Sequence, residues 1–156
     1  HFAVGNYDRS RAAYEQLLAI HPDDLMALNN LAYMLAENLD DPQAAMSLAE
    51  RAMRVAGENP TQRANVLDTV GWVHYCNDNL QDAEQALERS IRLRPMAVNH
   101  LHLAKVYLAQ DRRSAARQQL SAAADLAEDA EDGSVAAEIQ QLLQSIDSTA
   151  ATNLER

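Results

Sequence analysis

Residues 67–95 read LDTVGWVHYCNDNLQDAEQALERSIRLRP, and this stretch decides the fold. It contains two apolar patterns with helical spacing, separated by a polar turn at residues 77–79 and followed by Pro95. Apolar residues that recur every three or four positions indicate one side of a helix, and a proline cannot continue a helix. Each pattern also holds a small residue, Gly71 or Ala83, where a neighbouring helix can approach closely. The stretch therefore predicts two short helices that pack against each other.

The same pattern occurs three times along the chain. It begins with a large residue followed by a small one, and these pairs are Leu31-Ala32, Val70-Gly71 and Leu103-Ala104. An alanine follows thirteen residues after the first member of each pair, at Ala44 (or equally Ala45 one residue on), Ala83 and Ala116. The last two copies are 33 residues apart and the first two are 39 apart, so the first copy carries an insertion. Tandem copies in phase indicate a repeat architecture, in which each helix pair buries its apolar face against the next pair.

This pattern resembles the tetratricopeptide repeat, a helix–turn–helix unit of about 34 residues. The resemblance covers residues 1–130, with three departures: His74 replaces the usual tyrosine, Ser90 the usual alanine, and Gly57 a proline. It implies an all-α fold, a right-handed superhelix of antiparallel helix–turn–helix repeats closed by a C-terminal capping helix.

The repeat phase predicts the organisation of the chain. We expect one domain over residues 1–147, with a half repeat at 1–22, repeats at about 25–59, 60–96 and 97–130, and a capping helix at 133–147. Residues 1–4 fit the end of a helix with Gly5 in the following turn, so we interpret the chain as a fragment of a longer bacterial-type protein. Residues 148–156 have no apolar stripe, and we expect them to be loose.

Composition and charge argue against several classes of function. The 156 residues include 29 Ala, 20 Leu and only 4 Gly, which favours helices and leaves no glycine-rich loop for phosphate. The net charge of −10 repels nucleic acid and anionic membranes, and no apolar run reaches the roughly 20 residues that a membrane span needs.

His100 and His102 diverge by about 200° on a helix, so they cannot hold one metal ion. Cys76 has no catalytic surroundings in the sequence. We expect no enzyme activity, no metal and no cofactor.

The resemblance also implies a binding surface. In this family the concave face of the superhelix is lined by one stripe of each first helix, and here those positions are Asn29, Tyr33, Glu37, Asn65, Asp68, Trp72 (with Tyr75 or Cys76), Leu101 and Lys105. The implied function is a scaffold that binds a partner peptide or helix in this groove. The alternative is a structural spacer or self-association segment of a larger protein. Trp72 is then a filler between helices rather than an anchor for a ligand.

The charges at these positions predict the chemistry of the partner. Glu37 and Asp68 are carboxylates, and Lys105 is the single basic position. We therefore expect a protein or peptide partner with an apolar anchor and at least one Lys or Arg, and neither nucleic acid nor membrane insertion.

Overall fold

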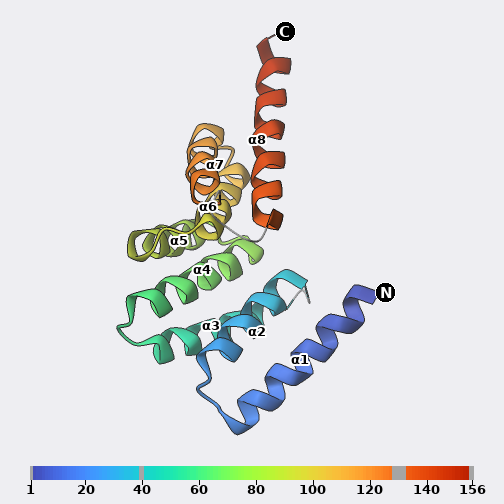
Figure 1. Cartoon of the computed structure of the whole chain (residues 1–156), viewed down its shortest axis with the longest axis vertical. Helices are drawn as coiled ribbons and strands as arrows, with labels where there is room; N and C mark the ends of the chain where they lie inside the picture. The colour runs from blue at the N-terminus through green and yellow to red at the C-terminus, as the bar shows by residue number, and fades with distance from the viewer. Residues whose placement is uncertain (1, 39–40, 128–132, 155–156) are drawn as a thin grey trace. The chain divides into compact units, whose positions relative to one another are not determined.

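The structure, a computed structural model of the chain, describes residues 2–38, 41–127 and 133–154, which form eight α-helices and no strand (Figure 1). The helices are α1 (Phe2–Ile20), α2 (Leu25–Asn38), α3 (Pro42–Ala56), α4 (Pro60–Cys76), α5 (Leu80–Leu93), α6 (Ala97–Ala109), α7 (Arg113–Ala127) and α8 (Gly133–Leu154). They form two compact units, of which unit 1 is His1–Arg94 and unit 2 is Pro95–Arg156. The prediction of an all-α fold built from helix–turn–helix pairs is confirmed.

Unit 1 is held together by two apolar clusters. Its helices pack on their neighbours in sequence, and α2 also contacts α4 (Figure 1). One cluster consists of Leu31, Met34, Leu35, Ala36, Ala45 and Val73, and the other of Leu28, Ala52, Ala56 and Val66. Helix α1 adds Leu18, which packs against both clusters. The repeated apolar stripes therefore become the shared interior of α1 to α4.

Helices α4 and α5 approach each other closely at Gly71. A Cβ atom at this position would lie 2.5 Å from Cγ of Leu87 and 3.2 Å from the carbonyl oxygen of Ala83. Leu87 and Ala83 are both 0% exposed, so neither has free space into which to move. The absence of a side chain at Gly71 therefore lets α5 pack directly on α4, as the large–small pattern predicts.

Polar side chains cap the starts of three helices. Asp41 Oδ1 accepts a hydrogen bond from the backbone N–H of Ala44, and Asn59 Oδ1 accepts one from Gln62, with a proline at the first helical position in both cases. Asp24 Oδ1 likewise accepts a hydrogen bond from Ala27. These side chains satisfy N–H groups that have no partner inside the helix.

The turns inside the second and third repeats have the same geometry, 33 residues apart. Asp78 and Asp111 both adopt a positive φ, of 60° and 57°, a conformation that Asp tolerates better than most residues. In both turns, the N–H of the next residue donates to a carbonyl five positions earlier: Asn79 to His74 at 2.9 Å and Arg112 to Tyr107 at 2.8 Å. The sequence repeat is therefore also a repeat of backbone conformation.

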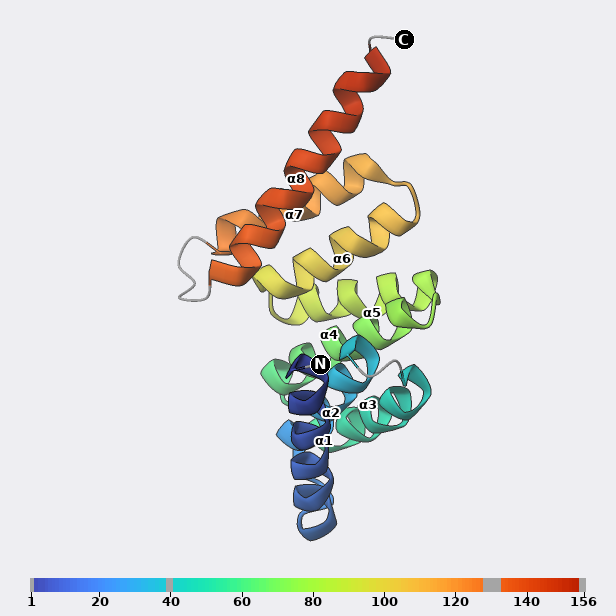
Figure 2. The ribbon, with the colours of Figure 1, turned by 90° about the vertical axis from the view of Figure 1, so that its right-hand side faces the viewer.

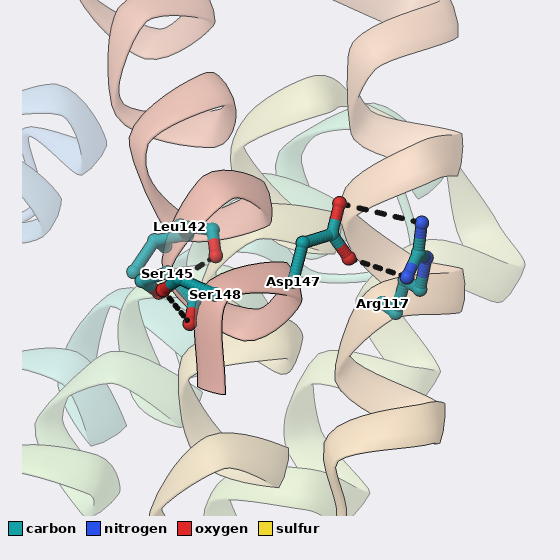
Figure 3. Close-up of polar contacts among 5 residues, drawn as sticks. All are labelled: Arg117, Leu142, Ser145, Asp147 and Ser148. Atoms are coloured by element: carbon teal, nitrogen blue, oxygen red, sulfur yellow. Dashed lines mark hydrogen bonds and ion pairs between the residues drawn. The ribbon is translucent and has the colours of Figure 1, made fainter. Parts of the chain in front are cut away.

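Unit 2 consists of the α6/α7 pair with α8 packed on both helices (Figure 2). Leu120 of α7 and Ile139 of α8 are 0% exposed. Two ion pairs attach α8: Lys105 Nζ lies 2.7 Å from Glu138 Oε1, and Arg117 Nη1 lies 2.5 Å from Asp147 Oδ1 (Figure 3). The expected capping helix is thus present.

Two expectations about the ends of the helices are wrong. Helix α1 runs through Gly5 without a turn, because one glycine costs a helix only about 1 kcal/mol and no proline stops it.

Helix α8 continues to Leu154, so the expected loose tail is helical from residue 148 to 154. No Gly or Pro interrupts this segment, and each further residue adds one backbone hydrogen bond to an existing helix. Ser145 and Ser148 also donate to carbonyl oxygens three residues earlier (Figure 3).

The close contact at Gly71 predicts a large effect of one added methyl group. We expect Gly71→Ala to lower the free energy of unfolding by about 1–2 kcal/mol, because the overpacking outweighs the better helix propensity of alanine. Urea unfolding followed by circular dichroism measures this change. Gly133→Ala is the matched control, since a Cβ there meets nothing within 4 Å. Equal stability of the two variants would show that α4 and α5 do not depend on the contact.

Candidate functional site

Helices α2 and α4 bring six of the predicted site residues to one face of unit 1, which we call the α2/α4 face. These residues are Asn29, Tyr33, Glu37, Asn65, Asp68 and Trp72. On each helix they recur every three or four residues, which places them on a single stripe. Direct contact between α2 and α4 then joins the two stripes.

An aromatic cluster occupies one end of this face. The Trp72 ring is stacked with Tyr33, at 6.3 Å between centroids, and with Tyr75, at 4.8 Å. Its indole Nε1–H donates a hydrogen bond of 2.6 Å to Glu37 Oε2, so α2 and α4 are also linked by a polar contact. Trp72 is only 4% exposed, so a ligand reaching this face meets Tyr33, Tyr75 and Glu37 first.

The environment of Tyr75 keeps its phenol neutral. Burial raises the pKa of Tyr75 above its ordinary value, and Cys76 and the Glu37 carboxylate raise it further. A neutral phenol can both donate and accept hydrogen bonds. Tyr75 therefore offers a ligand an amphipathic ring next to the carboxylate of Glu37.

A cavity of about 290 Å³, which we call the amide cavity, lies where α2 and α4 begin. It is lined by Leu25, Met26, Asn29, Asn30, Gln62, Asn65 and Val66. The Oδ1 atom of Asn29 is buried and has no hydrogen-bond partner among the described residues. Side-chain amides carry both donors and acceptors, as a peptide backbone does. The cavity therefore has the chemistry to bind main-chain N–H and C=O groups.

The two remaining predicted residues belong to unit 2. Leu101 is only 2% exposed, and the Lys105 ammonium is paired with Glu138 of α8. Both residues lie in unit 2, and the geometry of the α2/α4 face within unit 1 rests on the six residues of α2 and α4.

Sequence reasoning missed part of this site. Asn30 and Gln62 line the amide cavity, and Tyr75 was predicted only as an alternative to Cys76. Gln62 lies three residues before Asn65, and this spacing places it on the same stripe of α4. Asp68 is only 7% exposed, which the pattern of the sequence does not reveal.

The described residues contain neither a cluster of metal-binding side chains nor a membrane-spanning helix. Within residues 2–38, 41–127 and 133–154, no three His, Cys, Asp or Glu side chains are grouped to hold a metal ion. None of the helices in these ranges has the length and apolar character needed to span a bilayer.

Comparison with known sequences identifies the family. Residues 23–96 match the sequence model of the tetratricopeptide repeat. The match assigns residues 23–96 to the tetratricopeptide repeat family. Its repeats are those of a protein-interaction scaffold, and the family and its fold are typically non-catalytic.

Several known proteins are similar to the chain in sequence or in fold. TPR repeat-containing protein PA4667 of Pseudomonas aeruginosa is 34% identical over 79 residues, which cover 51% of this chain and 13% of that protein. The thermophilic TPR protein TTC0263 of Thermus thermophilus has a TM-score of 0.73 at 21% identity, over 92% of this chain and 76% of that one. MamA of Desulfovibrio magneticus RS-1 has a TM-score of 0.65 at 18% identity, over 83% of this chain and 71% of that one. These structures share the fold of the chain.

The raised pKa of Tyr75 predicts a loss of stability at high pH. Above the ordinary phenol pKa of about 10, Tyr75 ionises in the unfolded chain before it ionises in the folded one. The free energy of unfolding should therefore fall as the pH rises from about 10 through the raised pKa. Urea unfolding at about pH 9 and pH 11, compared with Tyr75→Phe, measures the contribution of this residue. Parallel losses in both proteins would contradict the assignment.

Proposed function

We propose that the α2/α4 face binds a peptide or helix of a partner protein. The observation that carries this proposal is the pairing of two features on one surface, the aromatic cluster around Trp72 and the amide cavity at Asn29 and Asn65. The cluster supplies an apolar contact for a side chain, and the cavity supplies hydrogen bonds for a main chain. Together they suit an extended segment that crosses both helices.

The charges of the face favour a basic partner. Glu37 is an exposed carboxylate next to the rings of Tyr33 and Tyr75, and it attracts a Lys or Arg beside an apolar side chain. Trp72 holds the Glu37 carboxylate in place through its hydrogen bond, so the indole positions the charged group. Leu101 and Lys105 of unit 2 remain predicted contacts with the partner. In this proposal, the Lys105 ammonium releases Glu138 and forms an ion pair with an acidic group of the partner.

Charge reversal at Glu37 tests the proposal. Short fluorescent peptides that carry Lys or Arg beside Leu or Phe are screened by anisotropy, and binders are retested on Glu37→Lys. We expect about tenfold weaker binding, because an attraction becomes a repulsion beside the aromatic cluster. Asn65→Ala should weaken the same peptides by removing main-chain hydrogen bonds.

Asp8→Lys is the matched control, since Asp8 is an exposed carboxylate of α1 outside the α2/α4 face. Equal losses in Glu37→Lys and Asp8→Lys would mean that only net charge matters. If no basic peptide binds and sedimentation shows self-association that depends on concentration, the chain acts as a spacer or self-association segment and the proposal is wrong.

A further inference from the structure

A second cavity lies on another side of unit 1, between α3 and α5. Both helices pack on α4 but not on each other, and α4 closes the gap between them. The cavity has a volume of about 440 Å³. Its floor is apolar and comes from all three helices, through Met53 of α3, Leu67 and Val70 of α4, and Ala86 of α5.

This cavity and the α2/α4 face use opposite sides of α4. The helix contributes Arg63, Leu67, Val70 and His74 to the cavity, and Asn65, Asp68 and Trp72 to the face. At about 100° per residue, the centres of these two stripes are roughly 160° apart. A ligand in the cavity therefore does not touch the α2/α4 face.

The rim of the cavity carries three arginines, two of which form no ion pair with a described residue. Arg54 and Arg89 are exposed, and neither forms an ion pair with a described residue. The third, Arg63, donates to the carbonyl oxygen of Gly57 at 2.7 Å and lies 3.5 Å from Glu58. Three arginines outnumber the two carboxylates of the lining, those of Glu50 and Asp82, although the whole chain has a net charge of −10.

The part of the lining that α4 contributes also contains a buried nitrogen atom without a hydrogen-bond partner among the described residues. His74 lines the cavity, and its Nδ1 atom is buried and forms no hydrogen bond with a described residue. His74 occupies the position where the family usually has a tyrosine, so this chain places a polar ring beside an apolar floor.

We propose that the α3/α5 cavity is a second docking site, which binds an acidic segment of a partner protein. The apolar floor takes an aliphatic side chain, and the Arg54 and Arg89 guanidinium groups bind a carboxylate next to it. Arginine suits this role because its planar group can donate two parallel hydrogen bonds to a carboxylate. The site is independent of the proposed peptide contact on the α2/α4 face. It selects an acidic segment, whereas the α2/α4 face selects a basic one.

Two matched peptides test this site on the full chain. One carries Leu residues flanked by Glu, and the other has the same sequence with each Glu replaced by Lys. We expect the Glu peptide to bind and the Lys peptide not to bind, with affinity falling at higher salt. Arg54→Glu combined with Arg89→Glu should weaken binding of the Glu peptide by about tenfold, which corresponds to about 1.4 kcal/mol.

Three controls establish whether the Glu peptide binds in this cavity. Arg9→Glu changes an exposed arginine of α1 that lies outside the cavity, and it should leave binding unchanged. Glu37→Lys, on the α2/α4 face, should not weaken the Glu peptide. A photo-crosslinker at Gln85, an exposed residue of the cavity lining, should capture the Glu peptide, whereas one at Gln81 should not.

Other outcomes overturn the proposal. Equal binding of the two peptides, or equal losses in Arg9→Glu and the double variant, shows that the arginines of the cavity do not select an acidic segment. If sedimentation shows that the chain self-associates, and the double variant abolishes this self-association, then a second copy of the chain is the occupant instead. Circular dichroism of each variant confirms that the helices are intact, and Arg54→Gln with Arg89→Gln repeats the test without new carboxylates.

Discussion

The contact between Gly71 and Leu87 fixes how the second half of unit 1 is built. Since no side chain projects from α4 at this point, α5 packs against its backbone, with Leu87 only 2.5 Å from where a Cβ would be. Helix α4 is also the partner of α2 and α3. One helix therefore contacts three others, and its position depends on a residue that contributes no side chain. The repeat pattern places a small residue here because a larger one would push the two helices apart.

The central position of α4 divides its surface among separate roles. Two of its stripes border the candidate sites, one with Asn65 and Trp72, and the other with Arg63 and His74. Helix α2 completes the first stripe as the α2/α4 face, and α3 and α5 complete the second as the cavity. Because both surfaces are made by rigid helices rather than loops, their shapes are largely formed before a ligand binds. Preformed surfaces lower the entropic cost of association.

Most of the fold follows from the sequence, whereas only part of the candidate site does. Periodicity, proline and capping residues are local signals, and Asp41 and Asn59, each directly before a proline, cap helices. The stripe on α2 and α4 is also visible, because spacing of three or four residues implies one helix face. Burial is not visible, since it depends on neighbouring elements: Trp72 is 4% exposed and acts on the face through Glu37. The cavity arginines come from three separate helices, and no spacing in the sequence shows that Arg54 and Arg89 line one cavity.

The net charge of the chain also gives an incomplete account of its partners. A total of −10 predicts attraction of basic partners at long range. At physiological ionic strength, however, charges are screened over about 8 Å, and a helix with its side chains is about 10–12 Å wide. A ligand on one side of α4 therefore senses mainly the charges on that side. In the two sites that we propose, the carboxylate of Glu37 sets the charge preference of the α2/α4 face, and the guanidinium groups of Arg54 and Arg89 set that of the cavity. A single acidic chain can thus present two surfaces with opposite charge preferences, because local charged groups outweigh the total charge at contact distance.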